Sequence, residues 1–103
     1  MRPSNDREAM TLILDGIEKR GCKVRQVQQD SWNPEELDDV ETVKEAVDLV
    51  MEVDEAVVFV DLPGGDASTW IFFVLGNSPE EVACDHGVSL SEYIDPITRC
   101  WWE

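Results

Sequence analysis

The strongest indication of the fold is the stretch 56–75, which reads AVVFVDLPGGDASTWIFFVL. Its two ends, 56–62 and 68–75, are rich in the β-branched and aromatic residues that favour strands. Between them, 63–66 reads Pro-Gly-Gly-Asp, a composition typical of a tight turn. We therefore predict a β-hairpin. Because 70–75 lacks any polar alternation, we expect the second strand to be buried on both faces and central in its sheet.

The residues before the hairpin predict two helices and one further strand. Residues 6–20 have apolar side chains at helical spacing, with Asn5 placed to cap the helix and Gly21 placed to end it. Residues 22–29 indicate a weak, mostly polar strand, which suits a sheet edge. The segment 38–53 repeats valine at helical spacing and predicts a second helix.

These elements predict an α+β fold forming a single domain over residues 1–103. We expect a small three-stranded sheet, antiparallel or mixed, in which 68–75 lies between 22–29 and 56–62. The helix at 38–53 would cross one face of it, as in a split β-α-β arrangement. After the hairpin, Ser78 and Pro79 favour a short helix that ends by residue 87, and a last helical piece follows.

The predicted helix at 38–53 carries acids at steps of three and four residues, and the last of them follows its end. The six acids are Asp38, Glu41, Glu45, Asp48, Glu52 and Glu55. On one continuous helix they would all lie on the face opposite the valines, over roughly 26 Å. Like charges at this spacing slightly destabilise a helix. We call the six acids the acidic stripe, and it is either a face that binds a partner, which would explain this cost, or simply a solvated face.

The chain is strongly acidic, with 23 acids, eight bases and a net charge of −15. Residues 26–103 hold two bases against 19 acids. Nucleic acids and anionic membranes are recognised by basic surfaces, so direct binding to either is disfavoured and a basic protein partner is favoured. Three widely spaced cysteines and the lack of an apolar leader lead us to expect a cytoplasmic protein. Adaptation to high salt would also explain abundant acids and only three lysines.

Residues that carry catalysis or bind metal are sparse. Cys84, Asp85 and His86 are adjacent, but no second pair of ligands completes a zinc site. His86 is the only histidine, and no nucleophile motif or phosphate-binding loop accompanies it. We therefore expect no enzyme, no metal and no cofactor. A small enzyme that pairs His86 with a cysteine is the third alternative.

Tryptophan is abundant, with four residues in the chain. We expect Trp70 in the hairpin core, and we favour a core position for Trp101 and Trp102 because a small domain needs their area. Trp32 precedes the acidic segment in a loop and could serve as an apolar anchor for a partner.

The favoured function is that of a small acidic inhibitor that binds a basic partner by imitating the charge of a nucleic acid. Phage anti-restriction and anti-CRISPR proteins, and immunity proteins that neutralise nuclease toxins, resemble this chain in size and charge. The resemblance is one of composition. The predicted site is the six acids together with Trp32. The alternative is a structural module that forms a homodimer through the apolar hairpin at 56–75.

Overall fold

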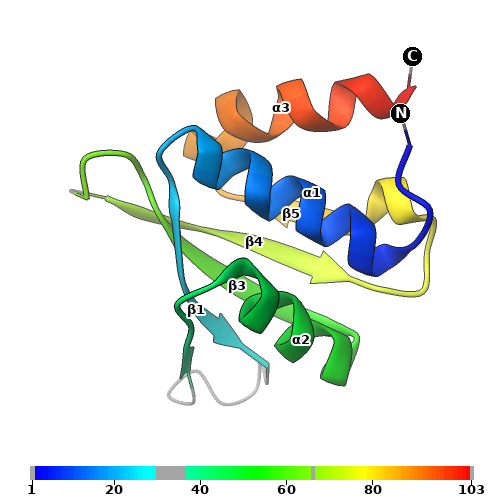
Figure 1. The fold of residues 1–103 in the computed structure, drawn as a ribbon, viewed down its shortest axis with the longest axis horizontal. Helices are drawn as coiled ribbons and strands as arrows, with labels where there is room; N and C mark the ends of the chain where they lie inside the picture. Colours follow the sequence, from blue (N-terminus) through cyan, green and yellow to red (C-terminus); the bar gives the residue numbers. More distant parts are fainter. Residues whose placement is uncertain (1, 30–36, 66, 103) are drawn as a thin grey trace.

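The computed structural model describes residues 2–29, 37–65 and 67–102, apart from the side chain of Trp102. Over this part of the chain the fold is α+β, with three α-helices and a five-stranded antiparallel sheet (Figure 1). The helices and strands are α1 (Asp6–Lys19), β1 (Lys23–Gln28), β2 (Asp38–Asp39), α2 (Val43–Val53), β3 (Glu55–Asp61), β4 (Ser68–Val74), β5 (Ala83–His86) and α3 (Ser91–Arg99). Three short 3-10 helices, Pro79–Glu81, Val88–Leu90 and Cys100–Trp102, complete the order.

The predicted hairpin is confirmed, but the predicted strand order is wrong. The sheet order is β2-β1-β3-β4-β5, so β1 lies beside β3 and not beside β4. Both hairpin strands are apolar on both faces, and apolar character alone therefore could not decide which of them meets β1. β1 and β3 are antiparallel neighbours, whereas a split β-α-β unit needs two parallel strands with a third strand between them. The segment that contains α2 therefore connects two adjacent antiparallel strands, and the predicted crossover does not form.

Two short strands that the sequence did not predict form the edges of the sheet. Residues 38–39 pair with β1, so β1 is an internal strand and not an edge. After a single 3-10 turn at Pro79–Glu81, the chain extends and pairs with β4, with Phe72 opposite Asp85. The short helix expected up to residue 87 is therefore wrong. Pairing with the apolar strand β4, through Ala83, Asp85 and His86, overrides the weak helix start.

The first helix begins and ends where its caps predict. The Asn5 side chain accepts a hydrogen bond from the Glu8 backbone N–H at 2.8 Å. Gly21 follows the helix with a φ of +103°, a left-handed conformation that glycine adopts without strain. These two local features fix the length of α1 and direct the chain into β1.

The three helices lie on one face of the sheet, with α1 between α2 and α3 (Figure 1). Along β3 and β4 every second side chain is buried against them, including Val58 and Phe73, which are fully buried. Trp101 is also buried, as predicted, and its carbonyl accepts a hydrogen bond from Arg2 Nε at 2.7 Å. This contact holds the two ends of the described chain together.

The opposite face of the sheet carries no helix of the described residues. We call it the open face, and its centre consists of Val57, Phe59, Trp70, Phe72 and Val74. All five side chains are half-buried. Neighbours across the hairpin contribute in pairs, Val57 with Phe72 and Phe59 with Trp70. The sheet is thus apolar on both faces, although helices cover only one.

Candidate functional site

The predicted acidic stripe does not lie on one helix. Only Glu45, Asp48 and Glu52 belong to α2; Asp38 lies in β2, Glu41 in the connection that follows, and Glu55 at the start of β3. Asp48 is half-buried and the other five are exposed. The prediction of a single six-acid helical face is therefore wrong. Trp32, the predicted apolar anchor, lies outside the described residues.

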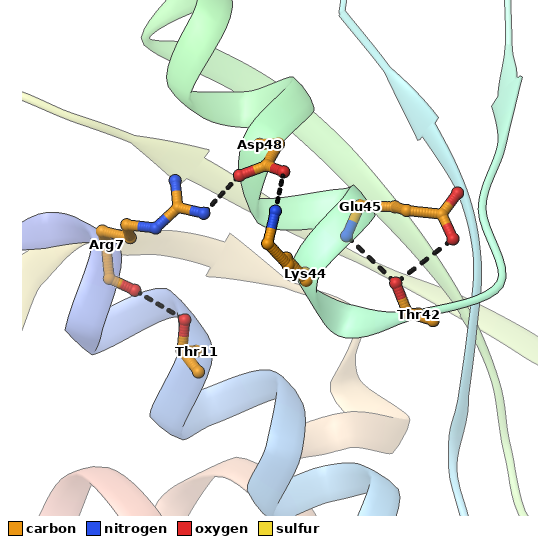
Figure 2. Close-up of polar contacts among 6 residues, drawn as sticks. All are labelled: Arg7, Thr11, Thr42, Lys44, Glu45 and Asp48. Carbon is orange, nitrogen blue, oxygen red and sulfur yellow. Dashed lines mark hydrogen bonds and ion pairs between the residues drawn. The ribbon is translucent and has the colours of Figure 1, made fainter.

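The start of α2 is set by its N-cap. The Thr42 side chain accepts a hydrogen bond from the Glu45 backbone N–H at 3.2 Å, and the Thr42 hydroxyl also lies 3.2 Å from Glu45 Oε1 (Figure 2). Thr42 and Glu45 have the Thr-x-x-Glu spacing of a capping box. That motif was present in the sequence and would have placed the helix start correctly. The valine spacing hid it, because Val40 continues the helical period beyond the cap.

The fold nevertheless brings several of the acids together. A shallow hollow of about 340 Å³ lies between β2 and α2, and we call it the acidic hollow. It is lined by Asp38, Asp39, Val40, Glu45, Asp48 and Leu49. Three of the predicted acids thus meet there and are joined by Asp39. Val40 is buried and Leu49 is half-buried, so the carboxylates lie beside apolar surface.

Asp48 is engaged within the molecule. Arg7 on α1 donates a hydrogen bond to one carboxylate oxygen of Asp48, and Lys44 Nζ donates to the other at 2.9 Å (Figure 2). These hydrogen bonds, from Arg7 first and Lys44 second, hold the pKa of Asp48 below its usual range. The residue therefore stays ionised and links α1 to α2, while its charge is largely balanced.

The remaining predicted acids differ in their surroundings. Glu52 accepts a hydrogen bond from Gln29 Nε2 at 2.9 Å, an uncharged contact that leaves its negative charge in place. Within the described residues, Asp38, Glu41 and Glu55 form no ion pair. Asp39 accepts a hydrogen bond from Gln26 Nε2 at 2.8 Å. The surface from β2 to the start of β3 is therefore predominantly anionic.

A second hollow, of about 570 Å³, lies where β1 bulges on the open face. Lys23, Arg25, Phe59 and Asp61 are among its lining residues. Arg25 Nε lies 3.2 Å from Asp61 Oδ2, and both signs of charge are present. Its lining holds two bases, Lys23 and Arg25, and three acids, Asp39, Glu41 and Asp61, so its charges are mixed, with one acid in excess.

Neither hollow includes the residues considered for catalysis. His86 lies at the end of β5, with Nδ1 2.9 Å from the Gly87 carbonyl oxygen, and neither hollow is lined by it or by a cysteine. Over the described ranges, no three acids, histidines or cysteines are grouped so that they could hold a metal ion. No helix in that same part of the chain has the length and apolar character needed to cross a membrane.

Comparison with protein-family models, curated proteins and solved structures found no match for this chain.

Proposed function

We propose that this chain binds a basic protein and blocks the surface with which that partner holds nucleic acid. The observation that supports this function is the acidic hollow, where four carboxylates surround apolar side chains. The chain would act by occupying the partner in equimolar amounts, with no chemical step of its own.

The hollow suits a long basic side chain. An arginine or lysine has an apolar stem and a charged end, so its stem can lie on Val40 and Leu49 while its end meets carboxylates. Arg7 and Lys44 already balance Asp48, which leaves Asp38, Asp39 and Glu45 to receive the incoming charge. Hydrogen bonds between ionised groups are stronger than neutral ones, which favours this pairing.

The wider surface would steer the encounter. Glu41, Glu52 and Glu55 lie on the same β2–α2–β3 segment, and Lys44 is the only base between residues 26 and 98. A basic groove built for phosphates attracts such a surface over several ångströms and binds it without reading any base. Binding of this kind weakens as salt rises.

The test compares two variants with the same change in charge. Asp38→Lys/Glu45→Lys reverses two acids of the hollow, whereas Asp15→Lys/Asp95→Lys reverses two exposed acids on α1 and α3. Asp48 is kept, because its replacement would also break the contact between α1 and α2. Wild type and both variants are immobilised and exposed to a host lysate at low and at high salt.

We expect a protein that wild type and the α1/α3 variant retain at low salt, and that the hollow variant loses. Once purified, this protein should release a bound nucleic acid when one equivalent of the wild-type chain is added. If both variants retain the protein equally, the position of the acids does not matter and they act only through the net charge of the chain. That result would favour adaptation to high salt over a binding site in the hollow. A captured protein that keeps its nucleic acid would refute the blocking function.

A further inference from the structure

The proposed function does not fill the hollow beside the β1 bulge, which we call the mixed hollow. Its volume of about 570 Å³ lies in the range of small-molecule sites. Leu37, Val40 and Phe59 form its apolar lining, in which Val40 is buried and Phe59 is half-buried. Its charged lining consists of two bases and three acids, namely Lys23, Arg25, Asp39, Glu41 and Asp61. The mixed hollow thus offers both signs of charge beside apolar surface.

Contacts within the chain engage some of these charges and leave others free. Arg25 Nε lies 3.2 Å from Asp61 Oδ2, and a guanidinium has five N–H donors, more than one carboxylate takes. Lys23 Nζ donates a hydrogen bond to the Glu41 backbone oxygen at 3.0 Å. Neither the Lys23 ammonium nor the Glu41 carboxylate forms an ion pair with a described residue. The mixed hollow therefore holds a base and an acid that are neighbours but are not paired with each other.

We propose that the mixed hollow binds a free α-amino acid with an apolar side chain. The carboxylate of this ligand would meet Lys23 and Arg25, where charge-assisted hydrogen bonds form. Its ammonium would meet the Glu41 carboxylate. Its side chain would lie on Leu37 and Phe59, where the burial of apolar surface adds affinity.

The closeness of the two signs of charge selects a zwitterion over other small molecules. In an α-amino acid a single carbon atom joins the ammonium to the carboxylate, and Lys23 and Glu41 are likewise in direct contact. An anion without an ammonium would meet three acids and leave Glu41 unpaired. A cation without a carboxylate would leave the donors of Lys23 and Arg25 unused. An α-amino acid pairs with both kinds of group at once.

The test uses L-phenylalanine, titrated into the isotope-labelled chain and followed by amide chemical shifts in NMR spectra. We expect saturable shifts confined to 23–26, 37–41 and 59–61, with a dissociation constant of about 1 mM. N-acetyl-L-phenylalanine lacks the ammonium and L-phenylalanine amide lacks the carboxylate, so each should bind more weakly by about five-fold or more. If the acidic chain merely attracts cations, the amide should bind best, because it alone carries a net positive charge. That result, or the lack of a saturable shift with L-phenylalanine, would overturn the proposal.

Two variants of the mixed hollow assign the contacts. Glu41→Gln should weaken the binding of L-phenylalanine by about five-fold or more and leave that of the N-acetyl form unchanged, because that ligand has no ammonium to lose its partner. Arg25→Gln should weaken L-phenylalanine in the same way and leave the amide unchanged, because the amide has no carboxylate. Both side chains are exposed, so we expect both variants to fold.

Matched controls remove the same charges elsewhere on the surface. Glu81→Gln and Arg99→Gln replace exposed residues that do not line the mixed hollow, and both should bind L-phenylalanine like wild type. Equal losses in the control variants and the variants of the mixed hollow would overturn the proposal. The acidic hollow is tested through Asp38 and Glu45, which do not line the mixed hollow, so either proposal can fail without the other.

Discussion

Two neighbouring phenylalanines in β4 provide a sharp test of the fold, because they point to opposite faces of the sheet. Phe73 is fully buried beneath the helices, whereas Phe72 is half-buried on the open face. Replacing Phe73 with alanine leaves a closed cavity as well as losing apolar contact, so we expect the free energy of unfolding to fall by about 3–5 kcal/mol. Phe72→Ala opens to solvent and leaves no cavity, and the loss should be about 1–2 kcal/mol.

The measurement is urea unfolding followed by far-ultraviolet circular dichroism, at protein concentrations where the chain is monomeric. With a slope of about 2 kcal/mol per molar urea, the midpoint should fall by about 2 M for Phe73→Ala and by under about 1 M for Phe72→Ala. If Phe73→Ala unfolds the chain entirely, the leucine variants at the same two positions should keep the ranking with smaller shifts. Equal losses, or a larger loss at Phe72, would refute the assigned register, since a shift of one residue exchanges the two faces.

Three further predictions follow from individual side chains. Burial raises the pKa of the Cys22 thiol, and the charges of Glu18 and then Glu92 raise it further, whereas Cys84 and Cys100 are exposed. At neutral pH a disulfide reagent should therefore modify Cys84 and Cys100 rapidly and Cys22 only after unfolding. Equal rates of modification for all three thiols would contradict this. Arg7 and Lys44 lower the pKa of Asp48 in the folded chain, so their contacts stabilise the fold fully above about pH 3.9, the pKa of an aspartate in the unfolded chain, and this stability is lost as the pH falls through the lower folded pKa. Asp48→Asn should therefore destabilise the protein at pH 7 and make its stability depend less on pH below about 4. An acid-unfolding curve identical to that of wild type would argue against the contact. Gly21→Ala should lower the free energy of unfolding by about 1–2 kcal/mol, because alanine is strained at the left-handed φ of Gly21; thermal melting that matches wild type would show that the backbone there can relax.

Features that depend on nearby residues could be predicted from the sequence. The hairpin follows from two apolar runs around Pro-Gly-Gly-Asp, and α1 follows from Asn5 and Gly21, because turns and caps are local. The strand order and the sheet edges could not be predicted in this way. Asp38 and Asp39 have no strand propensity of their own and form β2 only because β1 lies beside them. The same applies to β5, whose hydrogen bonds come from β4.

The candidate site was predicted in part, for a related reason. Spacing alone picks out the acids, but it places all of them on one helix, whereas the capping box at Thr42 and Glu45 starts the helix only after Asp38 and Glu41. The structure moves Asp38 onto a strand and still places it beside Glu45 and Asp48, around Leu49. No periodic rule in the sequence relates a strand residue to a helix residue in this way. The engagement of Asp48 by Arg7 likewise depends on how α1 packs on α2, since 41 positions separate the two residues.

The two edge strands have a consequence for how this chain behaves at high concentration. An exposed strand edge offers unpaired backbone groups to other molecules, and long, flat, apolar edges lead to fibrous aggregation. Here one edge consists of two aspartates, and the other is four residues long, irregular in register and carries Asp85. Both edges are too short and too charged to template another strand. We therefore expect the protein to resist ordered aggregation even though apolar side chains occupy both sides of its sheet.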